Sequence, residues 1–218
     1  MDSGNTVGSN NQGKVETLPA ETQSQVFDFR KPGESSGGAQ HTWGLSCPVF
    51  FVGFMGAGKT STTRKLARIA GVAALDMDTY IERRCDRKVK QIFAESGEAA
   101  FRAIETEVLR ELAQGEPRLV SCGGGVVLSE VNREILKENG FVVYLKVTAA
   151  EAASRISDLS TRPLFGDLEQ AQRIIDSRLP LYDEVADAEI DTAGRGTGSI
   201  AREAFSLLLK RGILQGAQ

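Results

Sequence analysis

Apolar and polar positions alternate in two ways along residues 46–214. Short apolar runs rich in Val, Ile and Phe are typical of strands buried on both faces, whereas apolar residues spaced three or four apart are typical of amphipathic helices. The predicted strands are residues 47–52, 72–75, 119–121, 141–146 and 188–191. The predicted helices are residues 62–70, 79–84, 89–95, 98–114, 129–139, 148–157, 168–179 and 199–208. This order predicts an α/β fold of the three-layer αβα type, with helices on both faces of a five-stranded parallel sheet.

Two breaks interrupt the helical pattern in the last third of the chain. Residues 158–167 are polar and contain Arg162-Pro163, which predicts a mobile loop. The helix that begins at Leu168 is predicted to stop before Pro180, because proline lacks the backbone N–H that a helix interior requires.

Residues 1–45 differ from the rest of the chain in composition. They are rich in Ser, Gly, Gln, Asn, Thr and Glu and have almost no apolar periodicity, so they cannot offset the entropy lost on ordering. We therefore predict a disordered N-terminal tail at 1–45 and one domain at 46–214. The tail has no apolar run for a signal peptide or a membrane-spanning helix, and its acidic residues disfavour an organelle transit peptide.

The overall charge and the scarcity of histidine narrow the possible chemistry. A net charge of -3 and a pI near 5.4 argue against a general nucleic-acid or membrane-surface binder, so a small-molecule partner is expected. The three cysteines show neither metal-site spacing nor an even disulfide framework, which favours a reducing, cytoplasmic compartment. The only histidine, His41, lies in the tail, so carboxylates, lysine and arginine must supply the chemistry.

A glycine-rich motif follows the first predicted strand. Residues 53–60, Gly-Phe-Met-Gly-Ala-Gly-Lys-Thr, satisfy the phosphate-loop pattern Gly-x-x-x-x-Gly-Lys-Ser/Thr, with a strand before and a helix after it. Backbone N–H groups of such a loop turn toward one point and bind phosphate, while Lys59 adds a full charge and Thr60 a hydroxyl for Mg²⁺. The residues predicted to contact nucleotide here are Gly56, Ala57, Gly58, Lys59, Thr60 and Ser61.

A phosphate loop alone does not separate kinases from GTPases or motor ATPases. No Asn-Lys-x-Asp motif is present, so the guanine-reading element of typical GTPases is missing. Asp76 and Asp78 follow the next predicted strand, and period-2 alternation is expected to place both carboxylates on the same side of the chain.

The chain resembles the shikimate kinase family, small phosphate-loop kinases related to the nucleoside monophosphate kinases. Six blocks carry the resemblance, in family order and at family spacing, over about residues 48–210. They are residues 53–60, 76–78 with 81–82, 92–94 with 97–98 and 101–105, 123–125, 162–164, and Arg178. The resemblance implies a phosphate-loop kinase fold with a helical substrate-binding region and a mobile lid.

The resemblance also implies the roles of the residues that would act on the substrate. Asp76 would order Mg²⁺ with Thr60, and Asp78 would accept the proton of the attacking hydroxyl. Arg102 and Arg178 would bind the carboxylate of shikimate, since a guanidinium meets a carboxylate in a bidentate way, with Glu105 placed to hold Arg102. The remaining substrate-binding residues would be Phe93, Gly123, Gly124 and Gly125.

The nucleotide end of the site carries the weaker part of the resemblance. Arg162 would be the lid arginine over the phosphates, and Arg155 would stack on adenine. Residues 191–198, which hold Arg195 as a further nucleotide contact, depart from the family pattern, because Thr197 stands where the family has a proline.

We therefore expect an ATP- and Mg²⁺-dependent kinase that phosphorylates the 3-hydroxyl of shikimate and acts as a monomer, with no nucleic-acid or membrane partner. Two alternatives stay open. Another small-molecule kinase of the same fold, such as a gluconate kinase, would share the phosphate loop. An inactive family member would bind nucleotide without turnover.

Overall fold

A computed structural model describes residues 43–155 and 167–216. The predicted disordered tail thus lies outside the described residues up to position 42, and so does most of the loop predicted at 158–167. Among the residues described, no helix is both long and apolar enough to cross a membrane.

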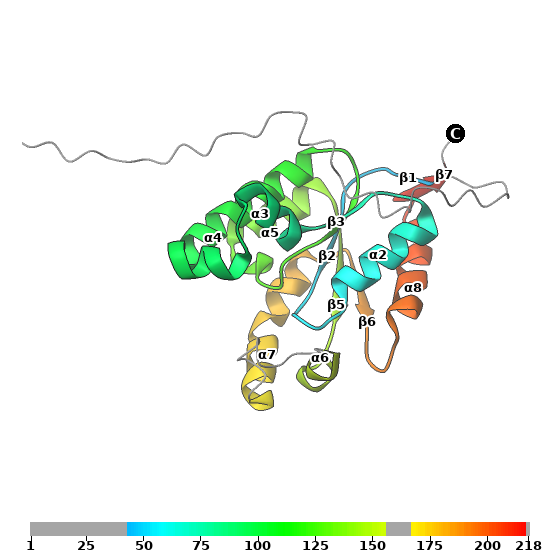
Figure 1. The fold of residues 1–218 in the computed structure, drawn as a ribbon. Coiled ribbons are helices and arrows are strands. Elements are labelled where there is room, and N and C mark those ends of the chain that lie inside the picture. The colour runs from blue at the N-terminus through cyan, green and yellow to red at the C-terminus, as the bar shows by residue number, and fades with distance from the viewer. Residues whose placement is uncertain (1–42, 156–166, 217–218) are drawn as a thin grey trace, which may run out of the picture.

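A parallel sheet forms the centre of the molecule (Figure 1). It has five strands in the order β3-β4-β2-β5-β6, and every neighbouring pair is parallel. The strands are β2 (Val49–Val52), β3 (Ala74–Asp76), β4 (Leu119–Ser121), β5 (Phe141–Lys146) and β6 (Ala188–Asp191). This confirms the predicted three-layer α/β fold.

Helices cover both faces of the sheet (Figure 1). They are α2 (Lys59–Ala70), α3 (Met77–Cys85), α4 (Val89–Gln114), α5 (Glu130–Asn139), α6 (Ala149–Arg155), α7 (Leu168–Val185) and α8 (Thr197–Lys210), with a 3₁₀ turn η1 (Val126–Leu128). Helix α4 contains the predicted break, because Gly97 has φ 80° and ψ 173° inside it.

Alternate residues of strands β2 to β5 face two separate hydrophobic clusters. In β2, Val49 and Phe51 belong to the cluster beneath α2 and α8, whereas Phe50 and Val52 belong to the cluster beneath α3, α4 and α5. Helix α7 contributes to both clusters. The sheet therefore separates two sets of helices that meet only around its ends.

Two predicted boundaries are wrong. Helix α7 does not stop at Pro180 but continues to Val185, because Tyr182 and Val185 beyond the proline bury their side chains in the core. Trp43–Leu45, predicted as tail, form strand β1, which pairs antiparallel with β7 (Leu214–Gly216). Trp43 also packs edge-on against Phe205 at a centroid distance of 5.5 Å, and this contact fixes the strand to α8.

Candidate active site

The segment between β2 and α2 forms the phosphate loop. Gly56 and Gly58 have φ angles of 81° and 86°, in the left-handed region that favours glycine. Lys59 is buried, and its Nζ donates hydrogen bonds to the carbonyl oxygens of Gly53 (2.7 Å) and Phe54 (3.0 Å). The loop's own carbonyls thus hold the lysine charge at the N-terminal end of α2, which also favours anions.

The phosphate loop packs directly on helix α6. A Cβ added to Gly56 would lie 2.8 Å from the Cα and the carbonyl oxygen of Ala152, so a side chain does not fit at this contact. Ala57 is buried beside it, whereas Ser61, in the first turn of α2, is exposed. Ser61 therefore lies at the outer rim of the loop.

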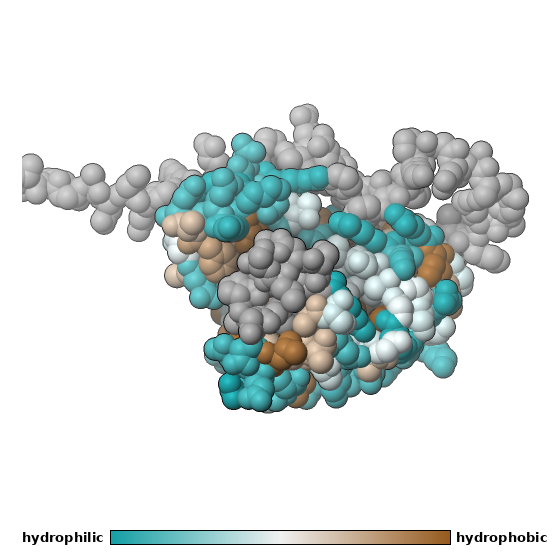
Figure 2. All heavy atoms as spheres, turned by 60° about the horizontal axis from the view of Figure 1, so that its bottom comes forward, coloured by the Kyte–Doolittle hydropathy of each residue, from teal (hydrophilic) through white to brown (hydrophobic). Residues whose placement is uncertain are grey.

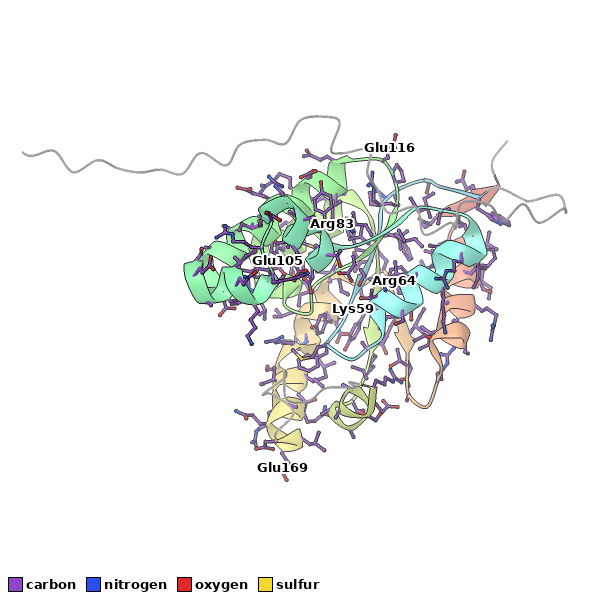
Figure 3. All side chains as sticks on the ribbon, in the orientation of Figure 1. Lys59, Arg64, Arg83, Glu105, Glu116 and Glu169 are labelled. Carbon is purple, nitrogen blue, oxygen red and sulfur yellow. The ribbon has the colours of Figure 1, made fainter. Side chains whose placement is uncertain are left out.

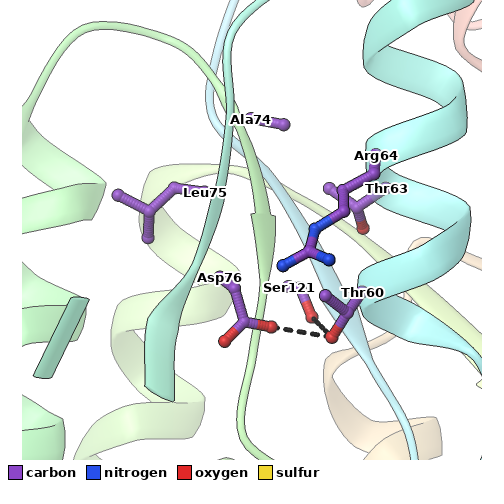
Figure 4. A pocket seen from close by; sticks show the side chains of 7 residues that line it. All are labelled: Thr60, Thr63, Arg64, Ala74, Leu75, Asp76 and Ser121. Carbon is purple, nitrogen blue, oxygen red and sulfur yellow. Dashed lines mark hydrogen bonds between the residues drawn. The ribbon is translucent and has the colours of Figure 1, made fainter. Parts of the chain in front are cut away.

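Oxygen atoms from three elements surround a small recess next to Lys59 (Figure 4). The hydroxyl of Thr60 donates to Asp76 Oδ2 (2.7 Å) and lies 3.1 Å from the hydroxyl of Ser121. In Figure 4 the guanidinium of Arg64 points into the same recess. Hydroxyl and carboxylate oxygens are the ligands that Mg²⁺ prefers, so the donor set fits the predicted metal.

The two aspartates do not follow the expected alternation. Strand β3 ends at Asp76, whose side chain caps α3 by accepting the backbone N–H of Thr79 (3.1 Å). Asp78 therefore lies in the first turn of a helix, where the period-2 rule does not apply. Asp76 faces Thr60, while a Cβ added to Gly123 would lie 3.1 Å from Asp78 Oδ1, so Asp78 faces the glycine triplet instead.

Arg102 lies against the last glycine of the triplet. A Cβ added to Gly125 would come within 2.6 Å of its guanidinium, which shows how closely the two groups approach. Its Nη1 donates to Glu105 Oε2 (2.7 Å) and its Nη2 to Glu98 Oε1 (3.1 Å). Two carboxylates from the same helix thus orient the guanidinium.

Glu105 is the buried carboxylate of the site. Its side chain is 1% exposed, and burial raises its pKa even though Arg102 acts in the opposite direction. The charge of Asp78 raises that pKa further, and Glu105 Oε1 lies as near to the Cβ position of Gly123 as Asp78 does. Figure 3 labels Glu105 on α4 and Lys59 at the start of α2, on opposite sides of the central sheet.

Arg178 approaches the phosphate loop from α7. Its guanidinium lies 5.6 Å from the ring centre of Phe54 in the phosphate loop and interacts with the hydroxyl of Tyr182. Tyr182 in turn donates a hydrogen bond to the carbonyl oxygen of Gly124 (2.7 Å). Arg102 thus lies against Gly125, while Arg178 is linked to the neighbouring Gly124 only through Tyr182.

Phe93 lies at the edge of this group. Its ring contacts Phe101 at 4.6 Å between centroids, and 36% of the residue is exposed. Arg102 lies over the same Phe101 ring at 5.4 Å from its centre, so Phe101 lies between the exposed aromatic ring and the guanidinium contacts.

The residues predicted at the nucleotide end are bound to the turn after β6. Arg155 donates to the hydroxyl (2.9 Å) and the carbonyl oxygen (2.5 Å) of Thr192. Arg195 donates to the carbonyl oxygen of Asp191 (2.9 Å) and pairs with Glu203. The predicted lid residue Arg162 lies outside the described residues.

Sequence reasoning missed two polar residues of the site. Ser121 pairs with Asp76 across neighbouring strands, and only the strand register reveals that their side chains share one recess. Tyr182 lies beyond Pro180, where the helix was predicted to have ended. The signal for Tyr182 was its position one helical turn after Arg178.

The comparisons with known proteins agree with this geometry. A family model described as shikimate kinase matches residues 55–209. The shikimate kinase of Bordetella avium is 43% identical over 148 residues, which cover 66% of this chain and 71% of that protein. The shikimate kinase of Actinobacillus succinogenes is 38% identical over 164 residues, which cover 73% of this chain and 94% of that protein.

Solved structures give the same result. The shikimate kinase from Acinetobacter baumannii, in complex with shikimate, superposes with a TM-score of 0.70 at 37% identity, over 76% of this chain and 94% of that one. A gluconokinase from Sinorhizobium meliloti has a TM-score of 0.52 at 19% identity, over 77% of this chain and 94% of that one, so it shares the fold alone. From the family match and these relatives we conclude that the chain belongs to the shikimate kinase family.

Proposed function

We propose that this protein transfers the γ-phosphoryl group of ATP to the 3-hydroxyl of shikimate, giving shikimate 3-phosphate and ADP on the route to chorismate and the aromatic amino acids. One observation carries the proposal. Asp78 and Arg102 lie at Gly123 and Gly125 of a glycine triplet that adjoins the phosphate loop, and Arg178 lies over Phe54 of that loop, beside the tyrosine that bonds Gly124.

The loop and Lys59 bind the phosphates. Backbone N–H groups of residues 56–60 face the β- and γ-phosphates, and the buried Lys59 exchanges its loop carbonyls for phosphate oxygens. Thr60 and Asp76 would hold Mg²⁺, with Ser121 beside them. When bound, the metal neutralises charge that develops on the phosphate oxygens.

Arg102 and Arg178 bind the carboxylate of shikimate. Bidentate pairing at a site remote from the reacting hydroxyl fixes the orientation of the ring. The binding energy is thereby used to align the hydroxyl for reaction. Backbone N–H groups of residues 123–125 are available to the ring hydroxyls, because glycine leaves them uncovered. Phe93 covers the outer side of the ring.

Asp78 acts on the hydroxyl that attacks. The hydroxyl oxygen forms a bond to the γ-phosphorus, the bond from that phosphorus to the bridging oxygen of ADP breaks, and the hydroxyl proton passes to the Asp78 carboxylate. Glu105, buried beside Asp78 and paired with Arg102, keeps the acid-binding group next to this base.

The nucleotide base lies at the other end of the site. Arg155, held by Thr192, offers a guanidinium face for the base, and Arg162 and Arg195 remain predictions for nucleotide contacts. We propose that the protein acts as a monomer, and light scattering tests that state. The three cysteines are unpaired in the fold, which suits a reducing, cytoplasmic compartment.

ADP release on addition of shikimate tests the proposal. We expect turnover that requires ATP, Mg²⁺ and shikimate and that falls by at least about a thousandfold in Asp78→Asn, which keeps the shape of the side chain but not its basicity. D-gluconate serves as the competing acceptor. Turnover with gluconate but not shikimate would contradict the assignment, as would ATP binding with no turnover on either acceptor.

A further inference from the structure

Tyr182 is a buried residue of α7 that contacts the site without facing solvent. Its residue exposure is 0%, and its ring stacks on Tyr144 of β5 at 4.9 Å between centroids and an interplanar angle of 14°. Its hydroxyl donates to the carbonyl oxygen of Gly124 at 2.7 Å. The ring is therefore fixed by the core, and the hydroxyl is the only polar atom of the side chain.

The other partner of that hydroxyl is Arg178, one helical turn earlier. Burial raises the pKa of Tyr182 to about 12, and the charge and hydrogen bonding of Arg178 oppose this rise only in part. The phenol thus stays protonated near neutral pH. It donates its proton to Gly124, while the guanidinium of Arg178 lies beside its oxygen.

Gly124 connects this pair of residues to the phosphate loop. A Cβ added to Gly124 would lie 3.3 Å from the backbone nitrogen of Met55 and 3.6 Å from the carbonyl oxygen of Gly53. Arg178 itself lies over the ring of Phe54 in the same loop. Arg178, Tyr182, Gly124 and the loop therefore form one closed set of contacts.

We propose that Tyr182 is a positioning residue of the phosphoryl transfer, whose hydroxyl fixes the guanidinium of Arg178 at a set distance from Gly124 and the phosphate loop. The inference rests on the proposed function, because the guanidinium it fixes is the one that binds the substrate acid. Loss of the hydroxyl leaves Arg178 on a flexible stem with several rotamers, so alignment of the acid is lost while the phosphate machinery stays intact.

A purely structural role for the hydroxyl predicts a different result. A buried hydroxyl that only satisfies the Gly124 carbonyl would affect stability and would weaken all acceptors alike. If the hydroxyl instead positions Arg178, its loss affects only an acceptor that carries a free carboxylate. Comparison of shikimate with its methyl ester therefore separates the two roles.

The experiment measures kcat and KM for Tyr182→Phe, with Tyr144→Phe as the matched control. Both changes remove one hydroxyl from the same ring stack. We expect kcat/KM for shikimate to fall about tenfold in Tyr182→Phe, mainly through KM, with the KM for ATP unchanged. For methyl shikimate the change should stay below about twofold, and Tyr144→Phe should match wild type with both acceptors.

Two results would overturn the inference. One is an unchanged kcat/KM for shikimate in Tyr182→Phe, and the other is an equal loss with the acid and the ester, whatever the effect on thermal unfolding. In the Arg178→Ala background, Tyr182→Phe should lower kcat/KM for shikimate little further, because the hydroxyl acts through that arginine. A wild-type protein that does not phosphorylate shikimate would instead refute the proposed function, so the two failures are distinguishable.

Discussion

The proposed acid-binding side of the site and its proposed nucleotide-base side are built in different ways. Around the glycine triplet, Arg102 pairs with the buried carboxylate of Glu105, and Arg178 lies beside the hydroxyl of the buried Tyr182. Around the turn after β6, Arg155 donates to the hydroxyl and the carbonyl oxygen of Thr192, and Arg195 binds the carbonyl oxygen of Asp191 and the exposed Glu203.

The two regions therefore differ in preorganisation: the first has arginines with buried partners, and the second has arginines bound to a nearby turn. On the proposed function, buried partners hold the acid-binding guanidinium groups in place before substrate arrives, which reduces the ordering cost of binding. In the turn after β6 Thr192 is buried, whereas residues 193–198 are exposed or half-buried, so their contacts depend on the shape of the turn. At the start of α8, the hydroxyl of Thr197 accepts a hydrogen bond from Lys65 (2.6 Å), and its methyl lies 3.4 Å from the Cβ position of Gly58.

Lys59→Met should impair the reaction as a whole, since it changes the phosphate loop rather than one side of the site. We expect turnover to fall by about a thousandfold or more, because the only buried cation of the phosphate loop is lost, while methionine keeps the length of the chain. A coupled assay for ADP measures the loss, and circular dichroism checks the fold. An active variant would remove Lys59 from the mechanism.

Arg102→Ala should impair the binding of shikimate without affecting the nucleotide. The loss of two charged hydrogen bonds should raise the KM for shikimate by about a hundredfold and leave ATP affinity unchanged. Calorimetry with each ligand gives both values. Arg84→Ala is the matched control, because Arg84 also pairs with two glutamates of α4 but belongs to α3. An equal loss of shikimate affinity in both variants would contradict the assignment of Arg102.

Gly56→Ala tests the contact between the phosphate loop and α6. The methyl group would meet the backbone of Ala152 at 2.8 Å at a φ of 81°, so we expect a loss of about 2 kcal/mol in the free energy of unfolding and weaker ATP binding. Urea unfolding and nucleotide titration measure the two effects. Gly44→Ala, where an added Cβ meets nothing within 4 Å, should leave both unchanged.

Glu151→Gln tests a contact on the nucleotide-base side and should have the smallest effect, which is on stability. The Glu151 carboxylate accepts the backbone N–H of Gly194 (2.8 Å), and this bond holds its pKa below 4.5. Since the folded-state pKa is lowered, the ionised group stabilises the fold above about pH 4.5, and this contribution disappears as pH falls through the lowered pKa.

Thermal unfolding between pH 3 and pH 7 checks the Glu151 prediction. The melting temperature of Glu151→Gln should lie slightly below that of wild type at pH 7 and converge with it in acid. Glu116→Gln, at an exposed position, is the control. A gap that widens toward acidic pH would mean that the carboxylate destabilises the fold.

The sequence predicted the sheet and the phosphate loop because both depend on local patterns. Buried parallel strands are continuous apolar runs, and the loop motif fixes its own backbone through Gly56 and Gly58. The hydrogen bond between Thr60 and Asp76 follows from the same topology, since the carboxyl ends of parallel strands meet at one edge of the sheet.

Residues whose positions depend on tertiary packing could not be predicted in the same way. Pro180 predicted the end of a helix, but burial of Tyr182 and Val185 outweighs the one hydrogen bond that proline removes. Strand-like alternation was expected to continue from Asp76 to Asp78, but the Asp76 side chain caps a helix that begins at Met77. The pairing of β1 with β7 joins segments of three residues each, which carry no periodic signal of their own.

The ribbon of β1 and β7 has a practical consequence for spectroscopy. Trp43 is the only tryptophan of the chain, and it pairs with Gly216 across this ribbon (Figure 1). The end with α6 and α7, seen face-on in Figure 2, lies away from it. Intrinsic fluorescence excited at the indole therefore reports whether β1 and β7 are paired, and its signal on adding nucleotide would measure long-range coupling rather than direct quenching by the ligand.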